Sequence, residues 1–502
     1  MMPAVSLSRL RSGDTTSIMV AVAVAFAIVV LGVFCGRLAT SHYGVIAIEL
    51  LLGVPVLVAI SRRPAVAIVV LLAVVASAFA YGSLPRVNLP GHPPINLADL
   101  LLAAAVGGTI LRRPWKSWPA PVRRYSVALV LLLLLASVAT IKTALLGYTQ
   151  SRDALYEFRN WLYLGVALTI ALEFSGSLWR SWLNVAIGFA AIVSIISIAG
   201  VASHSVASEL LTLDPTAAFS PTAVTLSGGG SVGWGITRIR LEGLYFIYSM
   251  CLPTLVMVLL VKDRWRRLRA AALLLMLAAV AVSLNRNMVV GAGVGVLVTA
   301  LIGGPRIRHR LAVVATASTV AVALVVLTSV APAITSPVGN RLESILAPSQ
   351  VEQSASYQDR AYELSFAFPS IARHPWFGVG PRQFYGAYLV TPDGTGARFF
   401  VQNLYIDLAT DYGVPAAIAF LLIPGVCLWF GLTRLRFATD PFDRAMLAAA
   451  IGTMVALLLS CLVDVFVQDP ETTVAFGASC GLLLAAALRT FRNNQQGREL
   501  NV

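Results

Sequence analysis

The sequence has little charge: only 12% of its 502 residues are Asp, Glu, Lys or Arg, whereas 58% are hydrophobic. A soluble chain of this length would divide into several domains with charged surfaces, so this composition excludes that class. Apolar runs of about 18 residues recur along the whole chain and indicate membrane-spanning helices. We therefore expect an all-α, polytopic integral membrane protein with about 12–14 transmembrane helices.

Metal ligands and paired thiols are also scarce. The chain has five histidines and five cysteines, and the cysteines lie in or beside apolar segments without C-x-x-C spacing. We interpret these cysteines as small apolar packing residues and not as disulfides. Because the histidines form no ligand-like cluster, the sequence predicts neither a metal site nor a cofactor.

The distribution of charge predicts the orientation of the chain. With a cytoplasmic N-terminus, most of the 37 basic residues fall on the cytoplasmic side and most of the 23 acidic residues fall outside. Positively charged loops resist translocation, so we expect both termini to be cytoplasmic in a bacterial plasma membrane. The net charge of +14 then indicates contact with anionic lipid and not with nucleic acid. The expected spans are 18–35, 44–60, 65–82, 96–111, 125–146, 160–174, 182–201, 243–261, 270–284, 287–302, 311–331, 413–432, 445–466 and 472–489.

Two long loops fall on the extracytoplasmic side, at about 202–242 and 332–412, where long loops are usually functional. We expect the second loop to be partly helical, because apolar residues recur at helical spacing from Tyr357 to Phe368, until Pro369 interrupts the stripe. We divide the chain into N-terminal transmembrane helices (1–201), a part with arginine motifs (202–331), the large loop (332–412), and C-terminal helices with a cytoplasmic tail (413–502).

Three arginines lie where arginine is disfavoured, at the extracytoplasmic ends of spans. Arg238 and Arg240 precede the span at 243–261, and Arg286 lies in the turn before 287–302. They could snorkel to the interface or pair with an acid such as Glu242. A guanidinium also grips a diphosphate through two hydrogen bonds, so a phosphate clamp is the functional alternative.

Four motifs follow one another over about 235–432: Arg240-x-x-Gly243, "SLNR" ending at Arg286, "QDRAYELSFAFPSIARHPWFGVGPRQF" and "QNLYIDLATDYGVPA". In this order they resemble the motifs of the O-antigen ligase and polymerase superfamily. In the last motif Asn403 and Gly413 stand at the family's spacing. The position of the ligases' histidine holds Gln402, and the last glycine is replaced by Ala416.

The resemblance implies a membrane glycosyltransferase similar to the GT-C class. Such proteins transfer a glycan from a polyprenyl diphosphate carrier to a hydroxyl, either on a lipid core (ligase) or on another carrier-linked chain (polymerase). Arginines neutralise the leaving diphosphate, so no metal is implied. Because Gln402 cannot act as a base, polymerase is favoured over ligase. Expected partners are the carrier-linked donor, a glycan or lipid acceptor, membrane lipids and other polysaccharide-assembly proteins.

Two alternatives remain open. A flippase for lipid-linked glycans could use the arginines together with Glu49 and Asp464, two acids within spans that could also be hydrogen-bonded and buried. A catalytically inactive relative could bind the glycan without transferring it. The unusual polar groups gather at the extracytoplasmic ends of the later spans, which favours chemistry at one face over transport.

The candidate site residues follow from these motifs. Arg240, Arg286 and Arg360 are the expected diphosphate clamp, and Asp407 is the expected base, with His374, Glu363 and Asp359 as alternatives. Asp407 and Asp411 could equally form a solvated polar stripe on an interfacial helix. His374 precedes a proline, which favours a turn.

The expected substrate-binding residues are Arg238, Gln402, Asn403, His374, Trp376 and Glu363. The aromatic residues Trp376, Phe377, Phe384 and Tyr385 could stack on sugar rings or anchor the interface.

Overall fold

The computed structural model shows a mostly helical protein. It describes residues 61–75, 86–87, 95–146, 151–176, 179–202, 224–225, 237–238, 243–282, 286–313, 355–381, 383, 385, 388–391, 394–397, 401–463 and 470–499. The expected spans 18–35 and 44–60, together with nearly all of 311–331, lie outside these residues, as do Glu49, Asp464 and Phe384.

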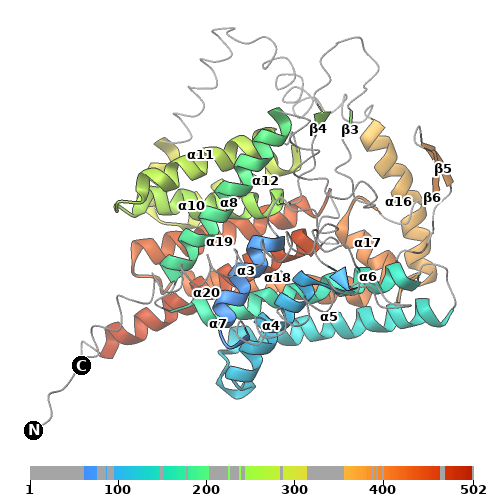
Figure 1. Cartoon of the computed structure of the whole chain (residues 1–502), viewed down its shortest axis with the longest axis horizontal. Helices are drawn as coiled ribbons and strands as arrows, with labels where there is room; N and C mark the ends of the chain where they lie inside the picture. Colours follow the sequence, from blue (N-terminus) through green and yellow to red (C-terminus); the bar gives the residue numbers. More distant parts are fainter. Residues whose placement is uncertain are drawn as a thin grey trace, which may run out of the picture.

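Helices make up most of the described chain (Figure 1). In chain order they are α3 Pro64–Val75, α4 Leu97–Arg112, α5 Ala120–Leu145, α6 Ser151–Leu162, α7 Val166–Phe174, α8 Trp179–Ala202, α10 Leu244–Leu260, α11 Arg266–Val282, α12 Arg286–Ile302, α16 Ala355–Arg373, α17 Leu404–Asp411, α18 Val414–Leu435, α19 Pro441–Ser460 and α20 Pro470–Glu499. Short 3₁₀ turns lie at Trp115–Ser117 and Tyr163–Gly165.

Three small antiparallel hairpins accompany the helices. They pair β1 Arg86–Val87 with β2 Ile95–Asn96, β3 Val224–Thr225 with β4 Thr237–Arg238, and β5 Tyr388–Thr391 with β6 Gly394–Ala397. In the last hairpin Tyr388 pairs with Ala397 and Thr391 pairs with Gly394. These hairpins lie in segments that connect the helices, so the protein remains an all-α protein in its architecture.

Five described helices are long and apolar enough to cross a membrane. They cover Ala120–Leu145, Trp179–Ile198, Val414–Leu435, Pro441–Ser460 and Pro470–Asn493. Shorter apolar helices cover Pro64–Val75, Leu244–Leu260 and Met288–Ile302. Both α18 and α19 carry a proline in their first turn, where the missing N–H group has no helical partner to lose. These helices confirm the prediction of a polytopic helical membrane protein.

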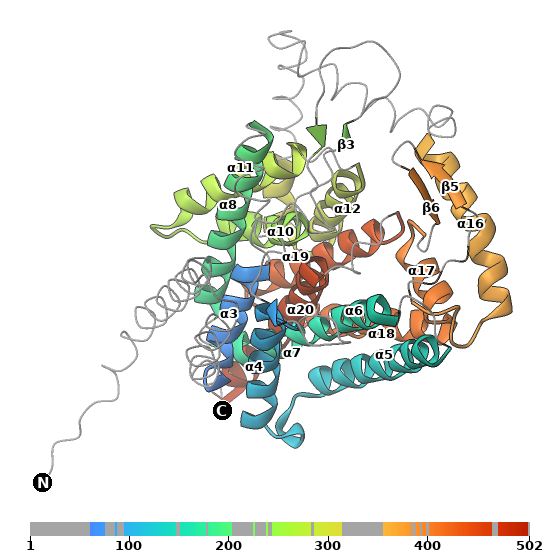
Figure 2. The ribbon, with the colours of Figure 1, turned by 45° about the vertical axis from the view of Figure 1, so that its right-hand side comes forward.

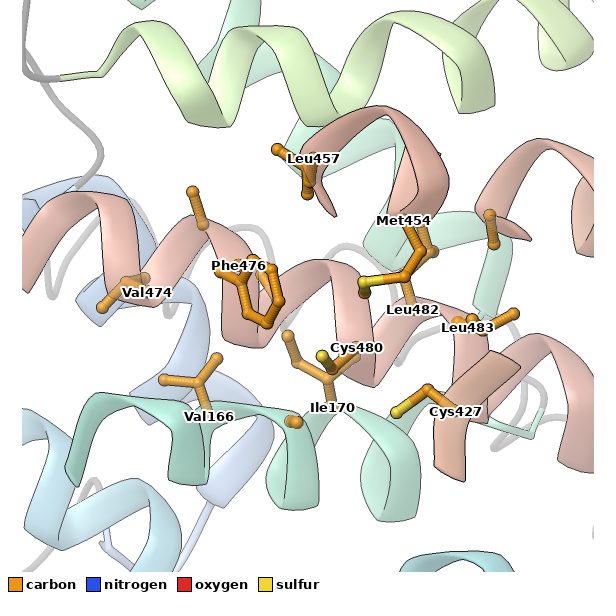
Figure 3. Close-up of a cluster of buried hydrophobic side chains, with 14 of the residues drawn as sticks. Val166, Ile170, Cys427, Met454, Leu457, Val474, Phe476, Cys480, Leu482 and Leu483 are labelled. Carbon is orange, nitrogen blue, oxygen red and sulfur yellow. The ribbon is translucent and has the colours of Figure 1, made fainter. Parts of the chain in front are cut away.

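The core is centred on α20, which packs against α7, α10, α18 and α19. The first part of α20 is buried almost completely, because its small and apolar side chains face neighbours on every side. Figure 3 shows side chains of α7, α18, α19 and α20 meeting in this core. The labelled residues are Val166, Ile170, Cys427, Met454, Leu457, Val474, Phe476, Cys480, Leu482 and Leu483.

The helix at the expected span 160–174 begins earlier, at Ser151, and contains a 3₁₀ turn between α6 and α7. The hydroxyl of Tyr125 on α5 donates to the carbonyl oxygen of Leu164 in that turn, at 2.8 Å. Tyr163 donates to Asp99 of α4, also at 2.8 Å. These bonds satisfy polar groups in and beside the turn, so the helix continues through it.

Pro369 does not interrupt its helix, contrary to the sequence-based expectation. Helix α16 continues through it to Arg373. A proline inside a helix removes its own N–H donor, but burial elsewhere can offset that loss. Here Ala367 is fully buried, α16 packs against α17, and the Arg373 side chain donates to the carbonyl oxygen of Pro369 at 3.2 Å.

Two glycines allow α12 and α19 to cross closely. A Cβ atom at Gly295 of α12 would lie 2.9 Å from the carbonyl oxygen of Gly452 on α19. A Cβ atom at Gly452 would overlap the carbonyl oxygen of Gly295 and Oγ1 of Thr299. Small residues at such crossings let helix backbones approach within a membrane.

We predict that Gly452→Ala destabilises the protein by about 1–3 kcal/mol, because the added methyl group forces α12 and α19 apart. The thermal midpoint of the purified protein in detergent measures this effect. The matched control is Gly293→Ala on α12, where an added Cβ atom has no neighbour within 4 Å. Equal midpoints for the two variants would contradict the close crossing.

Candidate functional site

Residues 374–380 of the large loop and residues 410–414 at the end of α17 form two turns that contact each other. The amide of Val379 donates to the carbonyl oxygen of Thr410 at 2.8 Å, and the amide of Gly380 donates to that of Asp411 at 3.1 Å. In the opposite direction, the amide of Val414 donates to the carbonyl oxygen of Pro375 at 2.8 Å. Segments far apart in the sequence therefore form one unit, which we call the docked turns.

Glycines make this docking sterically feasible. Gly378, Gly380 and Gly413 have φ angles of 62°, 115° and 90°, which side chains other than glycine rarely adopt. A Cβ atom at Gly413 would overlap the carbonyl oxygen of Trp376, and one at Gly378 would overlap that of Asp411. The glycines in both motifs therefore have a physical role, since they let the two backbones touch.

Neighbouring helices fix the docked turns in place. Nζ of Lys142, near the end of α5, donates to the carbonyl oxygen of Gly378 at 2.7 Å. The amide of Leu404 donates to the carbonyl oxygen of Cys461 at the end of α19, at 2.9 Å. Figures 1 and 2 both show α16, α17 and the β5–β6 hairpin at the end of the bundle where α5 terminates.

Asn403 determines where α17 begins. Its Oδ1 atom accepts hydrogen bonds from the amides of Tyr405 and Ile406 at 3.1 and 3.2 Å, which is the usual role of an N-cap asparagine. Its Nδ2 atom donates to the carbonyl oxygen of Leu462 at 2.9 Å. Both ends of this amide thus contact the protein itself, and the predicted contact of Asn403 with substrate stays a prediction.

Four buried carboxylates lie beside the docked turns. They are Glu157 of α6, Glu363 of α16, and Asp407 and Asp411 of α17, with exposed fractions of 1%, 4%, 0% and 1%. The alternative of a solvated polar stripe for Asp407 and Asp411 is therefore wrong. The reason is that α17 packs between α16 and α18 instead of lying at the surface.

Backbone and hydroxyl donors hold three of these carboxylates. Oδ1 of Asp407 accepts from the amide of Val401 at 2.7 Å, and Oε2 of Glu363 accepts from the amide of Gln402 at 2.8 Å. The Tyr412 hydroxyl donates to Oε1 of Glu157 at 3.2 Å. The acids are therefore fixed in orientation, as groups that act on a bound substrate must be.

Tyr385 lies among these carboxylates. Burial, followed by the charges of Asp407, Asp411, Glu363 and Glu157, raises the pKa of Tyr385 far above its usual value. The hydroxyl group therefore stays protonated at neutral pH. Sequence reasoning considered the ring of Tyr385 but not its hydroxyl, and it missed Glu157 and Lys142. For Glu157 and Lys142, the sequence offered one sign of a functional role. Lys142 was predicted at the extracytoplasmic end of a span, and Glu157 in the loop that follows it.

The predicted arginines are placed only in part. Arg286 begins α12, Arg360 lies in α16, and Arg238 lies in β4 opposite Val224. The side chains of these three residues and the whole of Arg240 lie outside the described part of the structure. The diphosphate clamp accordingly stays a prediction.

The remaining candidates are more exposed. His374 follows α16 in a turn, as expected from the proline after it, and its side chain is exposed. Trp376 is 70% exposed and Phe377 is 43% exposed, so both rings are available to a glycan or to lipid. Gln402 is half-buried beside Glu363.

Within the described residues, His, Cys, Asp and Glu form no group of three or more that could hold a metal ion.

The opposite end of the bundle carries ion pairs of another kind. Arg113 lies 3.3 Å from Glu173, Arg269 lies 2.7 Å from Asp263, and the third pair, Arg489 with Asp443, is separated by 2.9 Å. All three pairs join segments that were predicted to be cytoplasmic, whereas the docked turns join segments predicted to be extracytoplasmic. The orientation of these two sets of helix ends across the membrane stays a prediction.

We predict that Gly413→Ala disrupts the docked turns, because the side chain strains the backbone by about 1–3 kcal/mol and overlaps Trp376. Hydrogen exchange at the amides of Val379, Gly380 and Val414 should become faster. In the control Gly425→Ala, the added Cβ atom has no neighbour within 4 Å, and exchange at these amides should not change. Wild-type exchange in Gly413→Ala would contradict the requirement for glycine.

Comparison with known families gives one match. The family model described as O-antigen ligase matches residues 271–421, from within α11 to within α18. This segment includes both docked turns, three of the four buried carboxylates and Arg286. No curated protein matches the chain.

Proposed function

We propose that this membrane protein, whose residues 271–421 match the O-antigen ligase family model, transfers glycan from a polyprenyl diphosphate carrier to an acceptor hydroxyl at the extracytoplasmic face. The observation that carries the proposal is the docking of the two turns beside four buried, oriented carboxylates. The helices that carry these groups, α6, α16 and α17, lie together at one end of the helical bundle (Figures 1 and 2).

The reaction needs a group that removes a proton from the acceptor. In the proposed step the acceptor oxygen bonds to the anomeric carbon of the donor sugar, and the bond from that carbon to the diphosphate breaks. The diphosphate leaves with the electron pair, and the acceptor proton passes to a carboxylate. We assign this role to Asp407, because it is fully buried, is oriented by the amide of Val401, and lies in the same motif as Gln402.

The leaving diphosphate needs positive charge, which a cluster of carboxylates cannot provide. Arg240, Arg286 and Arg360 are the proposed clamp, since a guanidinium stays charged and binds two phosphate oxygens at once. Arg286 begins α12, and α12 packs against α19, whose end contacts the segment before α17. These contacts connect the helix that begins at Arg286 with the helix that carries Asp407.

Polymerisation is the favoured form of this transfer. The side-chain amide of Gln402 can orient a sugar hydroxyl but cannot accept its proton near neutral pH. A carboxylate then replaces the base that the ligases are expected to have at this position. The buried carboxylates described at one end of the bundle favour chemistry at one membrane face over a transport path through the protein.

We predict that Arg286→Ala and Arg240→Ala each reduce glycan assembly at least about 100-fold, because each removes charge that stabilises the leaving diphosphate. Amounts of protein in the membrane should not change. The measurement is the length and yield of the cell-surface glycan, and the control is Arg306→Ala, an exposed arginine at the opposite end. Wild-type glycan in both variants would exclude the clamp.

Deletion of the protein should leave single repeat units on their final acceptor. A polymerase joins repeats before they are transferred, so its loss removes the long chains and not the first unit. Sizing of the glycan measures this outcome. Long chains retained on the carrier lipid would instead identify a ligase, and short units trapped on the cytoplasmic side would identify a flippase.

A further inference from the structure

Among the described residues beside the docked turns, two side-chain donors are buried without a hydrogen-bond partner. They are the hydroxyl oxygen of Tyr385 and Nε2 of Gln383. A buried donor without a partner is costly, and folded proteins rarely retain one unless another molecule satisfies it. Neither residue belongs to the acid–base or phosphate-binding groups proposed above.

The docked turns hold Gln383 in place. The amide of Gln383 donates to the carbonyl oxygen of Gly380 at 3.2 Å, directly after the turn that bonds to α17. Gly380 packs against Thr143 of α5 and against the side chain of Gln383. Gln383 is therefore anchored to the docked turns through Gly380.

The charges around Tyr385 indicate which ligand would fit. Asp407, Asp411, Glu363 and Glu157 all act on its hydroxyl group and favour the protonated form, which donates a hydrogen bond. Carboxylate oxygens can accept hydrogen bonds from the neutral hydroxyl groups of a sugar. A neutral sugar ring satisfies the two donors and tolerates the acids.

We propose that the Tyr385 hydroxyl and the Gln383 amide bind the acceptor sugar, in a subsite separate from that of the carrier diphosphate. The acceptor is the substrate that must approach a carboxylate, because its hydroxyl loses a proton during transfer. This inference rests on the proposed function. It assigns a polar role to Tyr385, in contrast to a ring that only stacks or anchors.

Tyr385→Phe and Gln383→Met test the subsite in the purified full-length protein. Carrier-linked repeat units are extracted from cells that lack the protein, and mild acid releases their glycan from the carrier. This phosphate-free glycan is one probe. The other probe is inorganic diphosphate. Each variant should bind the glycan about tenfold more weakly, which corresponds to one lost hydrogen bond. Binding of diphosphate should not change, and the thermal midpoint should stay equal or rise, because no bond within the protein is lost.

The matched control is Tyr405→Phe, since the Tyr405 hydroxyl already donates to the carbonyl oxygen of Leu458 at 2.8 Å. This variant should lose thermal stability and retain glycan affinity. Wild-type glycan affinity in Tyr385→Phe and Gln383→Met, with normal transfer by the parent protein, would overturn the subsite and leave the proposed function intact. A parent protein that binds neither probe and whose deletion leaves the glycan unchanged would contradict both.

Discussion

The site depends on direct contact between two stretches of backbone. Hydrogen bonds of 2.8–3.1 Å join residues 375–380 to residues 410–414, and they can form only because Gly378 and Gly413 lack side chains. This contact fixes α17, which carries Asp407 and Asp411, and it anchors Gln383 through Gly380. One set of backbone interactions therefore positions two of the acids and Gln383.

Burial of several acids together is costly unless each has a defined environment. Here the acids come from α6, α16 and α17, and backbone amides or a tyrosine hydroxyl orient three of them. Such an arrangement is more costly than an apolar core and contributes little to the stability of the fold. The proposed glycan transfer accounts for this arrangement, because that chemistry requires a fixed carboxylate near a hydroxyl-bearing substrate.

The sequence predicted the elements of the fold better than their contacts. Long apolar runs identified α5, α8, α18, α19 and α20, because the thickness of a membrane sets the length of a span. The same periodicity could not show that α17 is buried, since its acids fit a surface helix equally well. Continuation of α16 through Pro369 and the bond from Lys142 to Gly378 depend on tertiary packing, which a single sequence does not encode locally.

The bond between Lys142 and Gly378 also has a mechanical consequence. Helix α5 exposes a row of apolar side chains that includes Val127, Val130, Leu134, Val138 and Ile141, a surface suited to lipid tails. A lipid-facing helix adjusts its tilt when the bilayer becomes thinner or thicker. Lys142 of α5 donates a hydrogen bond to the first docked turn. A change in the tilt of α5 therefore acts on the carbonyl oxygen of Gly378. A change in bilayer thickness therefore acts on the geometry of the site.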